Sequence, residues 1–415
     1  MGRGGQEVAC ASGGSILQRG PQPLRTPRWP VYPWDEPLER PLPARFLERP
    51  NRFLLRCLLD GRTVNAFLPN PGRLWELLLP GATVYLAAAH TPGQTRLPGR
   101  RTRYTVLAVE RDGVPVFLHT HLTNQVARWL IDRGLVPGLE RAEVVRREVT
   151  VGRSRFDFLL RQGKRHLLLE VKSCTLFGNR VAMFPDAVTE RGRRHLEHLA
   201  SLTRPDRRGV VLFLAHTDQV DWFMPDYHTD LAFSRALLKV RRQLRIIPLA
   251  IAWDGQLALC GPPKKLEVPW GYLQREVQDR GGYLVILPLK RRRRLVVGAL
   301  GELSFAPGYY VYAGSAMANL SARMARHLRR RKTMRWHIDY LRQVAGECTA
   351  LAIRSSQRCE CQLAAALNEL GEPEPAGFGC SDCHCPTHLF RFEENPLHQA
   401  SFHHLLQRFR MRPPD

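Results

Sequence analysis

The chain has 415 residues, 44% of them hydrophobic, with 62 Lys and Arg against 38 Asp and Glu. This length predicts two to four domains, and the formal charge of +24 predicts an anionic partner, nucleic acid first and an anionic membrane surface second. No apolar run approaches the ~18 residues that span a bilayer and no signal-peptide pattern is visible, so we expect a cytoplasmic protein whose cysteines stay reduced or bind metal.

The N-terminal third predicts a tail followed by a small barrel. Residues 1–35 are rich in Gly, Pro and Arg without periodicity, which predicts a disordered tail. Over residues 36–115, five short apolar segments predict strands, two of them joined by Asp60-Gly61, a strong hairpin signal. Five strands in this length favour an OB-like β-barrel that binds nucleic acid.

The rest of the chain predicts two further units. Residues 116–258 follow the order helix, three strands, helix, strand, helix, strand, which is typical of an α/β sandwich around a mixed sheet. Asn124 and Asp186 are the expected N-caps of the first two helices. Residues 259–271 predict a linker, residues 272–393 a third unit of α+β type, and residues 394–415 a basic tail.

Two neighbouring strands of the middle unit carry charged side chains among apolar residues that we expect to be buried, and burial of an unpaired charge is costly. "SRFDFLL" contains Asp157, and "HLLLEVKS" contains Glu170 and Lys172. Residues i and i+2 of a strand share a face, so Glu170 and Lys172 point together, and a hairpin would bring Asp157 beside them. Converging carboxylates suit Mg²⁺ or Mn²⁺, and a lysine can stabilise transition-state charge. The pattern predicts phosphodiester hydrolysis, although an exposed strand with an ordinary ion pair also fits it.

The runs "RREVTVGRSRFDFLL", "LLLEVKSCTL" and "AMFPDAVTERGRRHLEHL", with "RPNRFLLRCLLDGRTVNAFLPNPGRL" upstream, resemble the SfsA family over roughly residues 36–255. The resemblance implies an OB-like domain joined to a restriction-endonuclease-like PD-(D/E)xK domain, a Mg²⁺-dependent nuclease that binds DNA, with RNA as a second candidate. It places the motif on Asp157, Glu170 and Lys172 and adds Glu148 and Glu190, although Glu190 also fits a helix-dipole acid. The competing function is a non-catalytic DNA-binding regulator of sugar fermentation genes.

The C-terminal unit resembles the GIY-YIG nuclease superfamily in "GGYLVILPL", "GYYVYAGSA", "LSARMARH" and "ECQLAAALN". The resemblance implies a second nucleic-acid-binding or nuclease module. Its catalytic positions fall on Tyr283, Tyr312, Arg323, His327 and Glu360, with Glu360 as the metal-binding acid. The alternative is a tyrosine-rich sheet edge beside a solvated basic helix.

Two basic runs, "KRRRR" at 290–294 and "RHLRRRK" at 326–332, favour contact with a nucleic-acid backbone over a merely solvated face. The expected contact residues along the whole chain are Arg49, Arg52, Arg155, Arg191, Arg291, Arg292, Arg293, Arg329, Arg330 and Lys332.

The segment "CSDCHCPTH" has the spacing C-x2-C-x-C-x2-H. Thiolates and an imidazole at this density suit tetrahedral Zn²⁺, while reduced thiols in a core fit equally. The expected zinc ligands are Cys380, Cys383, Cys385 and His388, and Cys359 or Cys361 could substitute for one of them.

Overall fold

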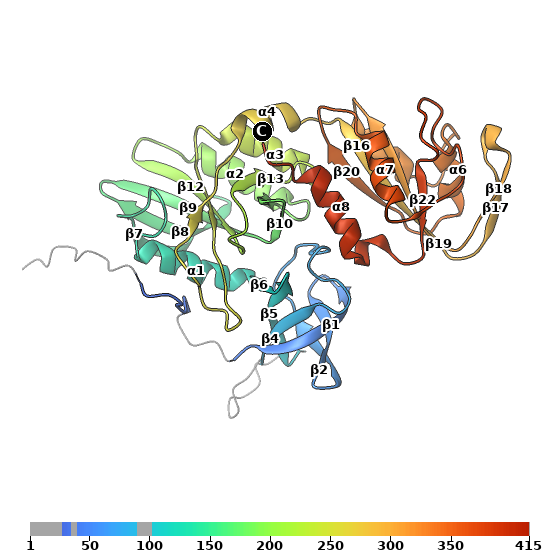
Figure 1. The fold of residues 1–415 in the computed structure, drawn as a ribbon. Coiled ribbons are helices and arrows are strands. Elements are labelled where there is room, and N and C mark those ends of the chain that lie inside the picture. The colour runs from blue at the N-terminus through green and yellow to red at the C-terminus, as the bar shows by residue number, and fades with distance from the viewer. Residues whose placement is uncertain (1–26, 35–39, 89–101, 415) are drawn as a thin grey trace, which may run out of the picture.

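The structure is a computed structural model that describes residues 27–34, 40–88 and 102–414, and its sheets form three successive modules (Figure 1). The expected tail over 1–35 falls mostly outside these ranges. Its described part, residues 27–34, is docked: Val31 bridges to Leu259, and the Trp34 ring stacks on Trp253 at a centroid distance of 5.6 Å. Within the described ranges, no helix has the length and hydropathy to cross a membrane.

The first module is an OB-like barrel, as predicted. Its strands are β1 (Leu42–Asn51), β2 (Leu54–Leu59), β3 (Arg62–Phe67), β4 (Thr83–Ala88), β5 (Tyr104–Arg111) and β6 (Val114–Phe117). They follow the order β3-β2-β1-β4-β5-β6, and a parallel β3–β5 pairing closes the barrel. Asp60 and Gly61 join β2 to β3 with φ of 47° and 75°, the positive pair that a tight hairpin turn requires. The sequence pattern did not reveal β1, whose exposed positions include Arg45 and Glu48.

The second module is a mixed sheet between helices. Its elements are α1 (Thr120–Asp132), β7 (Glu143–Val151), β8 (Ser154–Gln162), β9 (Arg165–Cys174), β10 (Leu176–Gly178), β11 (Val181–Phe184), α2 (Glu190–Ser201), β12 (Arg207–Ala215), β13 (Trp222–Pro225), α3 (Leu231–Val240), β14 (Arg245–Ala250) and β15 (Lys264–Lys265). The main sheet has the order β15-β14-β12-β9-β8-β7, and β10, β11 and β13 form a second, small sheet.

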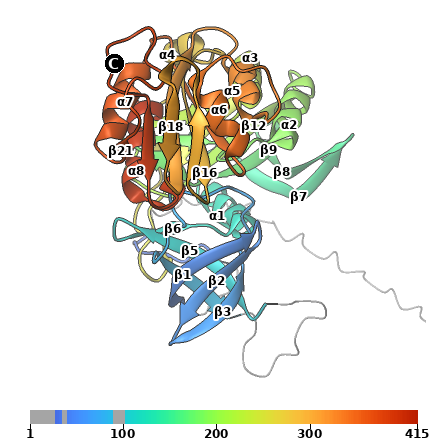
Figure 2. The same ribbon diagram turned by 90° about the vertical axis from the view of Figure 1, so that its right-hand side faces the viewer.

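Side chains of β12 alternate between two cores, because successive strand residues face opposite sides. Val211 and Phe213 share one cluster with residues of α2 and α3, whereas Val210 and Leu212 share another with residues of α1. The predicted α/β sandwich is therefore confirmed. Strands β7 and β8 reach out from the body of the module as a ribbon (Figure 2).

The third module is an antiparallel sheet with helices. Its elements are α4 (Trp270–Glu276), β16 (Gly281–Leu289), β17 (Arg293–Val296), η1 (Gly298–Leu300), β18 (Glu302–Phe305), β19 (Gly308–Ala316), α5 (Leu320–Leu328), α6 (His337–Val344), β20 (Thr349–Arg354), α7 (Glu360–Asn368), β21 (Glu372–Pro373), β22 (Leu389–Phe392), η2 (Pro396–His398) and α8 (Ala400–Arg410). The five-stranded sheet has the order β20-β16-β19-β22-β21, and among the described strands β17 pairs with β18 alone. This β17–β18 ribbon stands out at one end of the molecule and contains part of the "KRRRR" run (Figure 1).

Two predicted boundaries are corrected by the structure. Residues 394–415 are no basic tail, because α8 buries Phe402, Leu405 and Phe409 in the core of the third module. Residues 259–271 are no free linker, because β15 pairs with β14 as an edge strand of the second module. Composition concealed both features: α8 carries the exposed Arg408 and the half-buried Arg410, which donates to the Ala352 carbonyl, and β15 has only two residues.

The second and third modules share a core. One cluster combines Met183 and Tyr227 of the second module with Leu273, Val277 and Met411 beyond the expected boundary. Buried polar contacts reinforce this packing, since the backbone N–H of Arg354 donates to His228 Nδ1 at 2.9 Å and its guanidinium donates to the His228 carbonyl. The third module is therefore packed against the second rather than joined to it only through the chain.

Candidate functional site

The charged strand pair of the second module forms as predicted. β8 and β9 pair antiparallel, with Phe158 opposite Leu169. The Asp157 carboxylate accepts a 2.7 Å hydrogen bond from the backbone N–H of Val171 and a 2.8 Å bond from the Asn124 side chain. This places Asp157 beside the segment that carries Glu170 and Lys172.

Glu170 is the centre of the group. Its Oε1 accepts from the Lys172 ammonium and lies 2.9 Å from His195 Nδ1. Its Oε2 is buried and has no hydrogen-bond partner among the described residues. A buried carboxylate oxygen without a partner is costly unless something binds it. The oxygen donors of Asp157 and Glu170 fit a hard cation such as Mg²⁺ or Mn²⁺.

The environment separates the pKa values of the two carboxyl groups. Burial and the neighbouring Glu170 charge raise the pKa of Asp157 above its usual value. Burial also acts against ionisation of Glu170, but Lys172 and His195 outweigh it and hold the pKa of Glu170 below its usual value. Glu170 is therefore the more readily ionised carboxyl group of the pair, and a bound cation would favour ionisation of Asp157.

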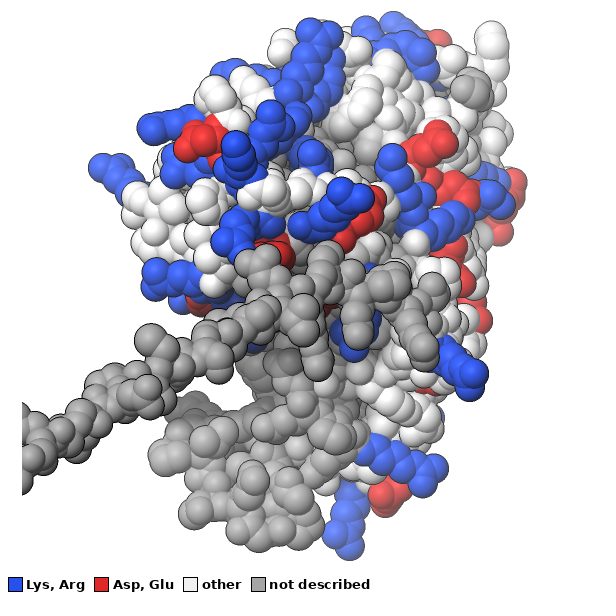
Figure 3. All heavy atoms as spheres, turned by 90° about the vertical axis from the view of Figure 1, so that its left-hand side faces the viewer, with Lys and Arg blue, Asp and Glu red and all other residues white. Residues whose placement is uncertain are grey.

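A cavity of about 920 Å³ opens over these carboxylates. Its lining comes from both the barrel and the second module, and its basic members are Arg52, Arg147, Arg155, Lys172 and Arg191. Exposed basic side chains continue outward over β7, β8 and their turns, namely Arg141, Arg146, Arg153, Arg161, Lys164 and Arg165. Figure 3 shows this side of the molecule, where Lys and Arg clearly outnumber Asp and Glu. A polyanion is thus attracted to a cleft that contains acidic groups at its base.

The two acids added by the resemblance differ in position. Glu148 lines the cavity, has a positive φ of 55°, which is uncommon for a non-glycine residue, and lies 2.9 Å from Arg155 in an ion pair. Glu190 is the exposed first residue of α2 and is not among the lining residues. The structure therefore brings Glu148, but not Glu190, to the cavity of Asp157.

Three residues of this site were missed or misassigned from the sequence. His119, not Asn124, caps α1, and this leaves the Asn124 amide to bind Asp157. Thr189, not Asp186, caps α2. Asp186 instead accepts from the backbone N–H of Leu74 at 2.8 Å and thereby ties the barrel to the cavity wall. His195, the partner of Glu170, gave no local signal.

A serine–histidine contact beside the site does not form a nucleophilic pair. Trp253 Nε1 lies 3.2 Å from His216 Nδ1, and because an indole N–H only donates, the imidazole hydrogen is on Nε2. That nitrogen, 3.0 Å from Ser173 Oγ, therefore donates to the serine. Burial lowers the pKa of His216 to about 3. His216 cannot accept the Ser173 proton, so acyl-enzyme chemistry is excluded for this pair.

The third module brings its predicted tyrosines and histidine together. Tyr283 Oη lies 2.9 Å from His327 Nε2, and the Tyr312 ring lies 6.4 Å from the Tyr283 ring between centroids. Burial raises the pKa of both phenols, so they remain protonated at neutral pH. Arg323 stacks over the Trp336 ring at 4.4 Å.

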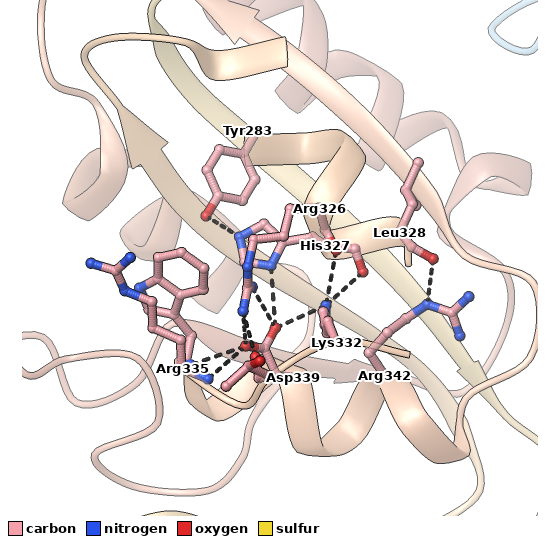
Figure 4. A network of polar contacts seen from close by, with 10 residues as sticks. Tyr283, Arg326, His327, Leu328, Lys332, Arg335, Asp339 and Arg342 are labelled. Carbon is pink, nitrogen blue, oxygen red and sulfur yellow. Dashed lines mark hydrogen bonds and ion pairs between the residues drawn. The ribbon is translucent and has the colours of Figure 1, made fainter. Parts of the chain in front are cut away.

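A buried aspartate anchors this group (Figure 4). Asp339 is fully buried and binds Arg326 at 3.0 Å and Lys332 at 2.8 Å, with His327 Nδ1 at 3.8 Å. Burial opposes its ionisation, but contacts with His327, Arg326 and Lys332 outweigh burial and hold the pKa of Asp339 well below its usual range. Asp339 thus fixes the end of the helix that carries His327, which in turn contacts Tyr283.

This network changes the expected nucleic-acid surface. The Lys332 side chain is only 5% exposed, so it stabilises the module rather than meeting a phosphate. Arg49 is half-buried and donates to three backbone carbonyls of the barrel, those of Arg73, Arg52 and Asn70. The other expected contacts are exposed, namely Arg52, Arg155, Arg191, Arg291, Arg292, Arg293, Arg329 and Arg330.

The predicted metal ligands of the third module also change in part. Cys383, Cys385 and His388 gather as expected, but the fourth member of the group is Cys361 from α7. Cys380 stands outside it, with its thiol 3.5 Å from the Phe378 carbonyl. Spacing along the chain favoured Cys380, whereas the fold brings the first turn of α7 to the loop.

Comparison with known proteins covers all three modules. Family models match at residues 47–118 (SfsA N-terminal OB domain), 121–256 (sugar fermentation stimulation protein RE domain) and 282–411 (domain of unknown function DUF123). A sugar fermentation stimulation protein homolog of Methanothermobacter thermautotrophicus is 36% identical over 235 residues, which are 56% of this chain and 95% of that relative. The Chloroflexus aurantiacus homolog is 40% identical over 222 residues, which are 54% of this chain and 81% of that relative. The solved structure of Pyrococcus furiosus SfsA in complex with Ca²⁺ is 29% identical, with a TM-score of 0.50, over 56% of this chain and 99% of that one.

Proposed function

This chain belongs to the SfsA family, and on that premise we propose that it is a divalent-metal-dependent nuclease that binds DNA and hydrolyses phosphodiester bonds. The observation that carries the proposal is the buried, partnerless Oε2 of Glu170, which lies beside Asp157 and Lys172 at the base of a basic cavity. A protein that only binds DNA has no need of two carboxylates at the base of its basic cleft. A hard divalent cation also fits the archaeal relative, whose structure is a complex with Ca²⁺.

In this mechanism Asp157 and Glu170 would hold Mg²⁺ or Mn²⁺, which would supply Lewis-acid polarisation of the scissile phosphate and activation of a water. The other roles are filled by groups of the protein itself. Glu170 holds the Lys172 ammonium in place, where it stabilises charge that develops on the phosphate. His195 Nδ1 lies 2.9 Å from the same oxygen of Glu170 and helps to fix the carboxylate. Asn124 and the Val171 N–H orient Asp157.

Substrate attraction comes from positive charge. Arg52 on the barrel and Arg155 and Arg191 on the second module border the cavity, so a strand that crosses it meets phosphate-binding groups from two modules. The GIY-YIG-like third module carries a separate basic ribbon, β17–β18, and we assign this module a nucleic-acid-binding role, with a second hydrolytic centre at Tyr283, Tyr312, Arg323, His327 and Glu360. RNA is a second candidate substrate, because an OB-like barrel and phosphate contacts accept both nucleic acids.

The test is incubation of the purified chain with labelled single- and double-stranded DNA and RNA, with Mg²⁺, Mn²⁺ or EDTA. We expect cleavage of at least one substrate that depends on the added cation. Binding without cleavage under every condition would favour the non-catalytic regulator instead.

A further inference from the structure

Four metal-binding side chains converge at one edge of the third module. Cys361 lies in the first turn of α7, whereas Cys383, Cys385 and His388 come from the loop that leads into β22. Their ligand atoms all lie within 4.8 Å of one another, and Cys383 Sγ is 3.4 Å from His388 Nε2. No other His, Cys, Asp and Glu group of this kind occurs in the described ranges.

These separations suit a tetrahedral ion. Zinc–sulfur bonds of about 2.3 Å and zinc–nitrogen bonds of about 2.0 Å place neighbouring ligand atoms roughly 3.5–3.8 Å apart. The observed group is therefore close to the required size before any ion draws it together. Three thiols and one imidazole form a soft donor set that selects zinc over Mg²⁺ or Ca²⁺.

The alternative of reduced core thiols fits the positions poorly. Cys361 is exposed, and Cys383 and Cys385 are only half-buried, whereas inert cysteines are usually among the most buried residues. The loop itself forms no helix or strand between β21 and β22, and Gly377 and Gly379 have φ of 76° and 80°. A metal that joins this loop to α7 would supply the stability that its own packing lacks.

Glu360 contacts the histidine of this group of four side chains. His388 is fully buried; its Nε2 faces Cys383, and its Nδ1 lies 3.2 Å from Glu360 Oε1. That contact has the distance of an ion pair without the alignment of a hydrogen bond. The other Glu360 oxygen accepts from the Ser315 hydroxyl at 2.5 Å. Metal-bound histidines commonly donate their second ring N–H to such a carboxylate, which fixes the ring and strengthens the ligand.

We propose that Cys361, Cys383, Cys385 and His388 bind one zinc ion and that Glu360 is the outer partner of its histidine. The ion then fixes the loop against Tyr312, because a Cβ on Gly379 would meet that ring at 2.8 Å. It also fixes the carboxylate of Glu360, the acid that the proposed second hydrolytic centre requires. This last consequence rests on the proposed function; the zinc site itself does not.

The first experiment measures zinc in the full-length chain, purified under reducing conditions without added metal. We expect close to one zinc per chain, and its loss in Cys361→Ser and in the double variant Cys383→Ser Cys385→Ser. Cys380→Ser is the matched control and should keep its zinc. The ligand assignment would be overturned if the wild-type chain contained no zinc. It would also be overturned if Cys380→Ser lost its zinc while Cys361→Ser kept it.

The second experiment measures zinc affinity by competition with a chelator. Glu360→Gln should bind zinc about 10–100-fold more weakly, which is the usual cost of removing an outer partner. Glu369→Gln, at the exposed far end of α7, should leave affinity unchanged. Equal affinity of Glu360→Gln and wild type would overturn the role of Glu360.

Controls for folding and for activity distinguish loss of the zinc ion from loss of the fold and from loss of DNA cleavage. Cobalt substitution reports thiolate coordination through visible absorption, and circular dichroism shows whether each variant is folded. The double variant Cys383→Ser Cys385→Ser should retain the Mg²⁺-dependent cleavage attributed to Asp157 and Glu170, because those residues lie in another module. If the wild type cleaves nothing, the zinc measurement still decides this proposal.

Discussion

The two carboxylates of the second module should affect folding stability differently when no metal is present. The Glu170 side chain is 7% exposed and its partner Lys172 16% exposed, so Glu170→Gln removes the carboxylate that a largely buried ammonium binds. Breaking such a pair costs about 3–5 kcal/mol, and we expect the lower end because the Gln carbonyl can still accept from Lys172. Asp157→Asn instead removes an ionisable group whose pKa is raised by burial and by the Glu170 charge, while an amide oxygen can still accept from Val171 N–H. The free energy of unfolding should therefore stay unchanged or rise.

Urea unfolding in EDTA, followed by circular dichroism, measures this difference. Glu143→Gln is the control, because its pair with Arg161 is exposed and contributes at most about 1 kcal/mol. Addition of Mg²⁺ at tenfold its dissociation constant should stabilise the wild type by about 1.4 kcal/mol and neither site variant. Equal destabilisation by Asp157→Asn and Glu170→Gln in EDTA would refute the opposed environments that the structure assigns to the two groups.

Three further predictions concern pH, salt and the module boundary. Because the pKa of Asp157 is raised in the folded state, its protonation stabilises the metal-free fold below the ordinary aspartate pKa, and this contribution is lost as the pH rises through the folded pKa. Mg²⁺ affinity should accordingly weaken as the pH falls toward that raised pKa. A Mg²⁺ affinity that does not depend on pH would contradict this prediction. The slope of log binding constant against log salt concentration should fall by about 1 in Arg155→Ala and in Arg191→Ala. Lys332→Ala should instead mainly lower the midpoint temperature of unfolding, and an unchanged midpoint would show that Lys332 is not part of the Asp339 network. A fragment of residues 272–414 loses the packing of Leu273, Val277 and Met411 on the second module and should unfold at a lower temperature than the intact chain; an equal midpoint would show that the modules fold independently.

Local signals in the sequence were sufficient for the centre of the site. The i, i+2 spacing of Glu170 and Lys172 and a short turn between two strands predicted the group that β8 and β9 assemble. Asn124 and His195 come from helices distant in sequence, and nothing near them indicates which strand they meet. Their contacts are set by how the helices pack on the sheet.

Composition was misleading where a charged segment also has a buried side. Lys332 belongs to a basic run, yet Asp339, in the following helix, draws it into the interior. The helix α8 contains two arginines, but Phe402 and Phe409 lie on its inner face. Likewise, Cys361 replaces Cys380 in the metal group because proximity in space, not spacing in the sequence, selects ligands.

The most direct test of the nuclease assignment compares binding and cleavage in the same preparation. Wild type, Lys172→Ala, the double variant Asp157→Asn Glu170→Gln and the Glu143→Gln control are each titrated with labelled DNA in EDTA and then supplied with excess Mg²⁺. We expect all four folded proteins to bind DNA with similar affinity. Wild type and Glu143→Gln should cleave it at equal rates, whereas Lys172→Ala and the double variant should keep only the cleavage that a further Glu360→Ala substitution removes. Cleavage at the wild-type rate by the double variant would contradict the assignment of the active site to Asp157 and Glu170.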